Sequence, residues 1–148
     1  MAHEGHHHAP HEAELKKQNV LESETEIFNN INSAYEKNVK PIFEAKCFAC
    51  HSSAPIKYPF YYNWPIAHQI MENDTNEAKI HINMDKGFPF GGHGTPEEDL
   101  EAVAKSAMAG SMPPLRYKIM HWGSGLTAEE SKIVIQWAED GLKLYKNK

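Results

Sequence analysis

Apolar residues recur every three or four positions along most of the chain, which is the period of an α-helix. The clearest stretches lie in residues 13–38, in residues 66–82 and after Thr127. The alternation typical of strands is weak throughout, so the pattern predicts an all-α domain. The apolar positions of the first stretch are Leu15, Val20, Leu21, Ile27, Phe28, Ile31 and Tyr35, and those of the last are Ile133, Val134, Trp137, Ala138, Leu142 and Tyr145.

Capping residues mark two of the helices. The run Thr95–Glu98 predicts a helix start, with threonine as N-cap, proline at the first position and glutamate completing a capping box. Gly110 can adopt the left-handed conformation and predicts the end of that helix. The run Thr127–Glu130 repeats the capping pattern at the start of the last helix.

A shorter helix is predicted before the two cysteines of the chain. Pro41 fits best in the first turn of a helix, so we expect a break near Asn38. Val39, Phe43 and Cys47 are spaced four residues apart, which places them on one face of a helix and turns the first thiol towards the interior. The region before the break is then an N-terminal helical extension.

Residues 47–51 read Cys-x-x-Cys-His, the attachment signature of a c-type haem. Cys47 and Cys50 lie close enough to add to the two vinyl groups of one porphyrin. The neighbouring imidazole of His51 can then reach the iron from one face, and imidazole is a common iron ligand. The motif therefore predicts one covalently bound haem c.

Three other interpretations compete with haem attachment. A thioredoxin-like motif belongs in a strand–helix pattern, whereas the flanks here are helical. A structural zinc site usually needs four ligands, and a second cysteine pair is absent, although histidines could complete a site. A plain disulfide would leave His51 without a role.

The glycine-rich stretch 87–94 lacks the spacing of a phosphate-binding loop.

The stretch after the motif, residues 52–65, is rich in proline and aromatic residues and predicts an irregular, packed loop. Such a loop can wrap a haem edge, with Tyr58 and Trp64 offering donors to propionates or backbone. A backbone carbonyl near Pro55 could accept the second imidazole N–H of His51. A satellite aromatic cluster of the core explains the composition equally well.

Met112 is the best candidate for the second axial ligand. It lies between two capped helices and is followed by two prolines, which stiffen the loop. Methionine opposite histidine is an electron-transfer arrangement. Core filling suits Met71, Met108 and Met120 better, because they lie in helical or apolar stretches. Arg116 could pair with a propionate or lie on the solvated surface. The rivals of Met112 as iron ligands are His68, His81, His93 and His121.

Composition and charge argue against some classes of binding partner. The chain has 148 residues and a formal net charge of −5, which argues against nucleic acid and anionic membrane surfaces. A redox partner with lysines on its surface would be compatible with this negative charge. No apolar run is long enough to span a bilayer, and no secretory signal is present. Since covalent haem attachment normally occurs outside the cytoplasmic membrane, we expect a periplasmic or otherwise exported protein whose leader was removed.

Residues 1–14 hold five of the ten histidines and predict a flexible segment ahead of a cytochrome domain over residues 15–148. Imidazoles in such a tract can bind copper, nickel or zinc. Adjacent histidines also bind divalent metals adventitiously, and a solvated tail or a purification remnant would look the same. The histidines of this segment are His3, His6, His7, His8 and His11.

These motifs together resemble class I monohaem cytochromes c and, more narrowly, a bacterial haem-binding-domain family. The shared residues span about 35–141: the haem motif, Tyr58–Tyr61, His81–Asn83, the Met-Pro-Pro loop, His121 and the Ile-x-Trp-Ala of the last helix. The resemblance implies a cytochrome c-like helical domain wrapped around one haem. It also implies that Cys47 and Cys50 hold the haem, with His51 as proximal and Met112 as distal ligand.

The expected function is electron transfer by Fe(III)/Fe(II) cycling, with redox proteins as partners and no enzymatic activity. The alternative is a gas-binding sensor or a small haem peroxidase, in which the distal ligand is displaceable and a histidine acts as distal acid or base. A third hypothesis is a metal-handling protein that uses the histidine-rich segment.

Overall fold

A computed structural model describes residues 9–147, and within this range it contains helices but no strand. The prediction of an all-α domain is confirmed. A single antiparallel bridge joins Asn83 to Gly91. The elements, in chain order, are α1 (Ala9–Ala34), the π-helical turn η1 (Tyr35–Val39), α2 (Lys40–Lys46), α3 (Phe48–His51), the 3-10 turn η2 (Phe60–Asn63), α4 (Pro65–His81), α5 (Pro96–Ala109), α6 (Leu115–Met120) and α7 (Ala128–Lys146).

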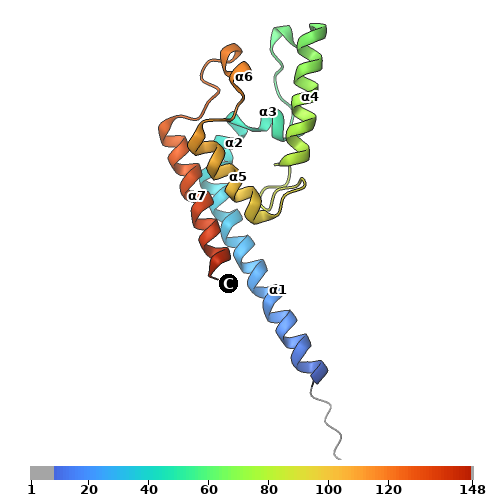
Figure 1. Cartoon of the computed structure of the whole chain (residues 1–148), viewed down its shortest axis with the longest axis vertical. Coiled ribbons are helices and arrows are strands. Elements are labelled where there is room, and N and C mark those ends of the chain that lie inside the picture. Colours follow the sequence, from blue (N-terminus) through green and yellow to red (C-terminus); the bar gives the residue numbers. More distant parts are fainter. Residues whose placement is uncertain (1–8, 148) are drawn as a thin grey trace, which may run out of the picture.

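The core lies where α5 and α7 pack beside the C-terminal half of α1 and its continuation into α2 (Figure 1). Four buried aromatic rings from distant parts of the chain meet there: Tyr35, Phe43, Phe90 and Trp137. The indole N–H of Trp137 donates to the carbonyl of Ile31 at 3.1 Å, which fixes α7 against α1. This cluster holds α2, and therefore the haem motif that follows it, against the rest of the domain.

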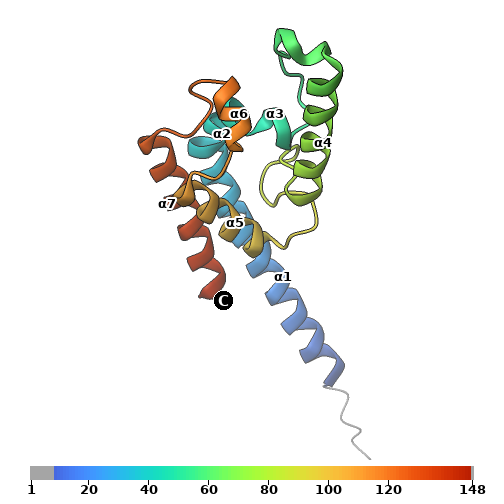
Figure 2. The same ribbon diagram turned by 45° about the horizontal axis from the view of Figure 1, so that its top comes forward.

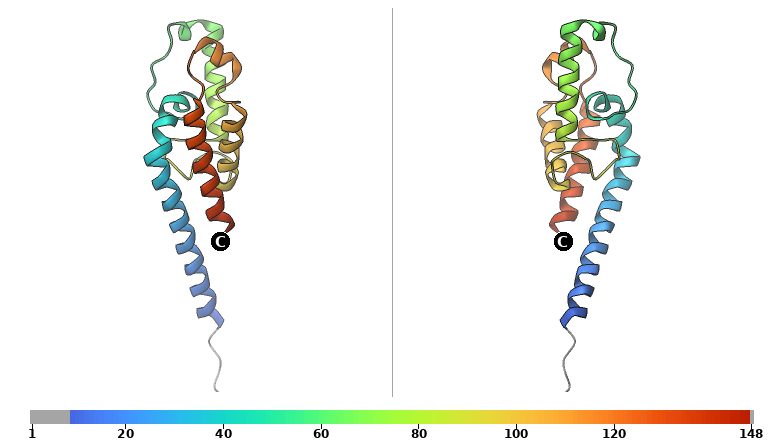
Figure 3. Two further views of the ribbon diagram at one scale, coloured as in Figure 1. Left: turned by 90° about the vertical axis from the view of Figure 1, so that its left-hand side faces the viewer. Right: turned by 90° about the vertical axis from the view of Figure 1, so that its right-hand side faces the viewer.

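Helix α1 extends well beyond this core, as Figures 1 and 3 show. Leu15, Val20 and Leu21 are exposed, whereas Ile27 and Phe28 pack against the core. The helical extension is therefore present. It begins at Ala9, so the last six residues of the predicted flexible segment are helical. His11 is exposed, and the other four histidines of the tract lie outside the described residues.

The predicted break near Asn38 is not an interruption. The chain continues from α1 through the π-helical turn directly into α2, and Pro41 stands in the first turn of α2 as expected. Proline lacks a backbone N–H and cannot donate an intrahelical hydrogen bond. The wider π-helical turn accommodates Pro41, because the N–H groups in the first turn of a helix have no intrahelical acceptor in any case. The two predicted capping boxes are confirmed at Thr95 and Thr127, and Gly110 ends α5 with a φ of 59°.

Several predicted core positions are exposed instead. Met108 and Met120 are each 59% exposed, so they do not fill the core as expected, and Ile133 is 39% exposed. The buried methionine is Met84, which is 4% exposed and lies in a stretch without helical periodicity. Helix α6, which ends at Met120, was not predicted because it is short and mostly solvent-exposed.

The glycine-rich stretch is part of the core. Phe88 and Phe90 are buried, and the loop lies against the C-terminal end of α4 (Figure 2). Gly92 has a φ of +114°, and a Cβ there would lie 2.5 Å from the carbonyl oxygen of His81. Only glycine permits this close approach. No helix in the described part of the chain is long and apolar enough to cross a membrane.

Candidate haem site

The haem motif forms a helical turn at the junction of α2 and α3. The backbone N–H of Cys47 donates to Phe43 at 2.7 Å, and the N–H groups of Cys50 and His51 both donate to the carbonyl of Cys47. Val39 and Phe43 are fully buried on the preceding face, as their spacing predicted. This turn presents two thiols and one imidazole from a stretch of five residues.

The imidazole of His51 is oriented by a backbone carbonyl. Its Nδ1 lies 2.8 Å from the carbonyl oxygen of Ile82, which can only accept, so Nδ1 carries the proton. Nε2 then keeps its lone pair for a metal. The expected acceptor near Pro55 is therefore wrong, because the carbonyl comes from the end of α4. Burial lowers the pKa of His51, which favours the neutral imidazole that binds iron.

The two cysteines are free thiols with little tendency to ionise. Burial raises the pKa of Cys47 to about 12, and burial also raises the pKa of Cys50. Thiol–disulfide exchange needs a lowered thiol pKa, so these values argue against a thioredoxin-like role. Among residues 9–147 no three His, Cys, Asp or Glu side chains gather as metal ligands, so the pair lacks the partners of a structural zinc site there.

A cavity of about 470 Å³ adjoins Cys50 and lies between the aromatic loop, α4 and α6. Its size suits a bound organic group, and its wall combines apolar with charged and polar side chains. Tyr58, Lys57, Tyr117 and His121 contribute to its wall. Lys57 is exposed and was not singled out in the sequence, yet its ammonium is suited to a carboxylate of a ligand in this cavity.

His121 joins α6 to the aromatic loop. Its Nδ1 lies 3.1 Å from the carbonyl of Tyr117 and therefore carries the proton, while the hydroxyl of Tyr61 donates to Nε2 at 2.6 Å. The ring also stacks on Tyr117 with centroids 3.8 Å apart. Both ring nitrogens are thus engaged within the protein.

The remaining predicted residues are less closely gathered. Tyr58 stacks on Tyr62 at the cavity wall, whereas Trp64 is exposed at the start of α4. Arg116 forms a bidentate ion pair with Asp74, which joins α6 to α4. The charge of Arg116 is therefore balanced by a residue of the same chain. Met112 is 49% exposed on the loop before α6, outside the cavity lining. Its role as distal ligand stays a prediction.

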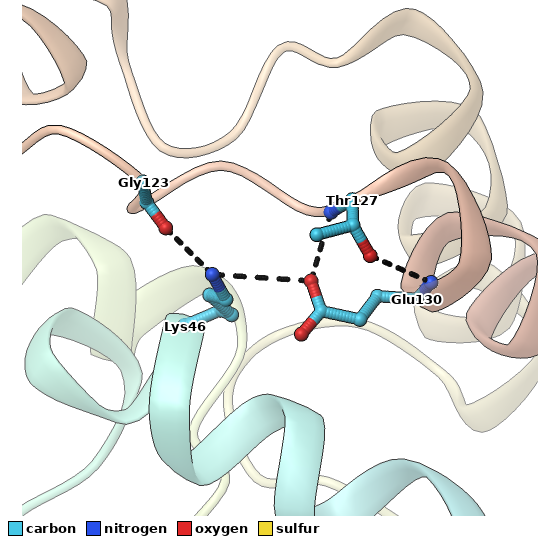
Figure 4. A network of polar contacts seen from close by, with 4 residues as sticks. All are labelled: Lys46, Gly123, Thr127 and Glu130. Atoms are coloured by element: carbon cyan, nitrogen blue, oxygen red, sulfur yellow. Dashed lines mark hydrogen bonds and ion pairs between the residues drawn. The ribbon is translucent and has the colours of Figure 1, made fainter.

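Lys46, which directly precedes the motif, secures the segment after α6 (Figure 4). Its ammonium donates to the carbonyl of Gly123 at 2.6 Å and lies 3.9 Å from the carboxylate of Glu130. Glu130 in turn accepts from the N–H of Thr127 in the capping box. Sequence reasoning missed this role because Lys46 and Gly123 lie 77 residues apart.

The comparisons with known proteins bear on the family of the chain. A family model described as a haem-binding domain matches residues 9–140, which is most of the chain. The chain belongs to the haem-binding domain family. The match begins at the start of α1, so the helix that lay outside the predicted resemblance is part of this haem-binding domain.

One curated relative is the cytochrome c peroxidase Ccp of Escherichia coli (strain K12). It is 26% identical over 96 residues, which cover 64% of this chain and 20% of that protein. The haem-binding domain therefore spans about a fifth of the length of this relative. No solved structure matches the chain.

The residues of this haem-binding domain fit the group that the family name implies. The hydroxyl oxygens of Tyr35 and Ser124 are buried without a hydrogen-bond partner among the described residues. Tyr35 lies close enough to Cys47 for the thiol to influence its pKa. Buried polar atoms of this kind normally find a partner, and a polar group of a bound molecule could supply one. The free thiols and the oriented imidazole supply the covalent and axial ligands of a haem site, and Cys50 is the member of the motif that lines the adjoining cavity.

Replacing Lys46 with methionine should lower the free energy of unfolding by about 1–2 kcal/mol, because a charged hydrogen bond to a distant loop is lost while the apolar stem is kept. The matched control is Lys40→Met, which removes an exposed pair with Glu36 one turn away and should cost clearly less than the loss at Lys46. Denaturant titration followed by circular dichroism measures both. Equal losses would contradict the role of Lys46.

Proposed function

We propose that this protein is a monohaem c-type cytochrome that carries electrons. Cys47 and Cys50 would hold the haem through thioether bonds, His51 would be the proximal ligand and Met112 the distal ligand. The observation that carries the proposal is the helical Cys-x-x-Cys-His turn, in which Ile82 fixes the tautomer so that the Nε2 of His51 has a lone pair that could bind iron.

The haem would supply one-electron Fe(III)/Fe(II) cycling, and the protein would set its potential and access. His51 contributes a neutral imidazole held by Ile82. Lys57, at the wall of the cavity, suits a propionate. A thioether from Met112 would raise the potential relative to a second histidine. Class I cytochromes c share these parts, and the resemblance noted in the sequence extends the proposal to that class.

The four histidines considered as rivals of Met112 all contact other side chains, which favours a carrier over a peroxidase that needs a free distal acid or base. Both ring nitrogens of His121 are engaged. His81 and His93 bond to each other at 2.6 Å and are exposed. His68 packs its ring against Tyr62.

A gas-binding sensor or small peroxidase is the second candidate, and the similarity to a cytochrome c peroxidase favours it. The half-exposed Met112 would also suit a displaceable ligand. Under either function we propose an exported protein, because covalent haem attachment normally occurs outside the cytoplasmic membrane. Redox proteins would be the partners of the carrier.

The first test concerns covalent attachment. Mass spectrometry of the denatured wild type should show one haem bound through two thioethers, while Cys47→Ser and Cys50→Ser should each retain at most one. The spectrum of the reduced pyridine complex reports the vinyl group that each single variant leaves unreacted. Haem that acid–acetone extracts completely from wild type would contradict the attachment.

The second test separates the carrier from the sensor or peroxidase. Reduced wild type should keep its spectrum under carbon monoxide at neutral pH, because a strong axial ligand occupies the sixth position. Met112→Ala opens that position and serves as the positive control for access. Carbon monoxide binding by wild type as readily as by this variant would favour the sensor or peroxidase.

A further inference from the structure

The segment 82–91 forms a strap that joins the core to the haem motif. Its far end is anchored by the buried rings of Phe88 and Phe90, and the N–H of Phe88 donates to the side chain of Asn32 on α1 at 2.9 Å. Asn83 and Gly91 exchange two backbone hydrogen bonds of 2.7 and 2.8 Å, which close the strap on itself. Because these contacts fix the strap, its N-terminal end can hold the residues bonded to it in a defined position.

The near end holds the residues of the motif at several points. The carbonyl of Ile82 accepts from the His51 ring, and the N–H of Met84 donates to the His51 carbonyl at 2.8 Å. Asp85 binds the two residues that follow His51 in the chain. One of its carboxylate oxygens accepts from the hydroxyl of Ser52 at 2.8 Å and from the N–H of Ser53 at 2.6 Å.

Asp85 is itself held in place. Its N–H donates to the side-chain oxygen of Asn83 at 3.0 Å. Ser52 is only 6% exposed, and its hydroxyl oxygen also accepts from the N–H of Ala54, so the serine leaves no alternative geometry for the bond to Asp85. The bonds from Ser53 and Ser52 keep the pKa of Asp85 below its usual value, as expected for a carboxylate that accepts two hydrogen bonds.

We propose that Asp85 is a positioning residue for His51, the proximal haem ligand. The carboxylate does not touch the imidazole. It clamps Ser52 and Ser53 to the strap and thereby fixes the end of α3, so that the His51 ring stays aligned with the carbonyl of Ile82. The inference rests on the proposed function, since it assigns a purpose to the clamp only if His51 binds the haem iron.

The experiment compares three variants of the haem-loaded protein. Asp85→Ala removes both hydrogen bonds, Asp85→Asn keeps an oxygen that can accept them, and Asp140→Ala is the control. Asp140 is a matched exposed carboxylate that accepts two side-chain hydrogen bonds on α7, away from the motif. Two readouts are used: hydrogen exchange of the Ser53 and Met84 amides, and the electron paramagnetic resonance g-values of the ferric haem, which depend on the orientation of the axial imidazole.

In Asp85→Ala the Ser53 amide should exchange about 10 to 100 times faster, because a hydrogen bond to a charged group is lost. The Met84 amide should also exchange faster and the g-values should shift, because the His51 segment loosens. Asp85→Asn should stay close to wild type in both readouts, and Asp140→Ala should be unchanged. A merely structural role would lower stability without moving the g-values.

Unchanged g-values in Asp85→Ala would overturn the proposal. So would an Asp85→Asn variant that behaves like the alanine variant, since charge and not hydrogen bonding would then be responsible. If Asp85→Ala fails to fold, Ser52→Ala removes one of the two bonds and should show a smaller shift of the same sign. Wild type without a low-spin ferric signal would instead refute the proposed function, and the assignment of Asp85 with it, whatever the amides show.

Discussion

The hydrogen bond between His51 and the carbonyl of Ile82 determines what the Cys-x-x-Cys-His turn can do. It joins residues 31 positions apart and leaves the imidazole with one protonated and one free nitrogen. Without it, a histidine beside two cysteines would be free to rotate and to exchange its tautomer. The bond depends on the end of α4 lying beside α3, which the two helices achieve by direct packing. The close contact between Gly92 and His81 holds the glycine-rich stretch against the same end of α4. The Cys-x-x-Cys-His motif therefore has an oriented imidazole only within this fold.

The rest of the domain places these two segments. The aromatic cluster around Tyr35 and Trp137 fixes α2, while Phe90 brings the glycine-rich stretch into the same core. Lys46 then secures the segment after α6 beside the motif. The cavity next to Cys50 is lined by residues from 49 to 79 together with Tyr117 and His121, so it depends on α6 lying beside the aromatic loop and α4.

Local signals in the sequence predicted much of this arrangement. The helical pattern, both capping boxes and the terminal Gly110 depend on residues a few positions apart, and all three are present. The burial of Val39 and Phe43 follows from their spacing. The acceptor for His51, the partner of Arg116 and the tie from Lys46 could not be predicted, because each joins residues 31 to 77 positions apart. The burial of Met84, unlike that of Met108, also depends on tertiary packing.

The most direct test of an electron carrier with methionine ligation is the far-red absorption of the oxidised protein. A thioether sulfur on low-spin ferric haem gives a weak charge-transfer band there. The account predicts this band in wild type and in Met108→Ala, a control in which a similarly exposed methionine is lost, and its disappearance in Met112→Ala. A low-spin spectrum without the band would contradict methionine ligation and point to a histidine. A high-spin wild-type spectrum would contradict the electron carrier itself.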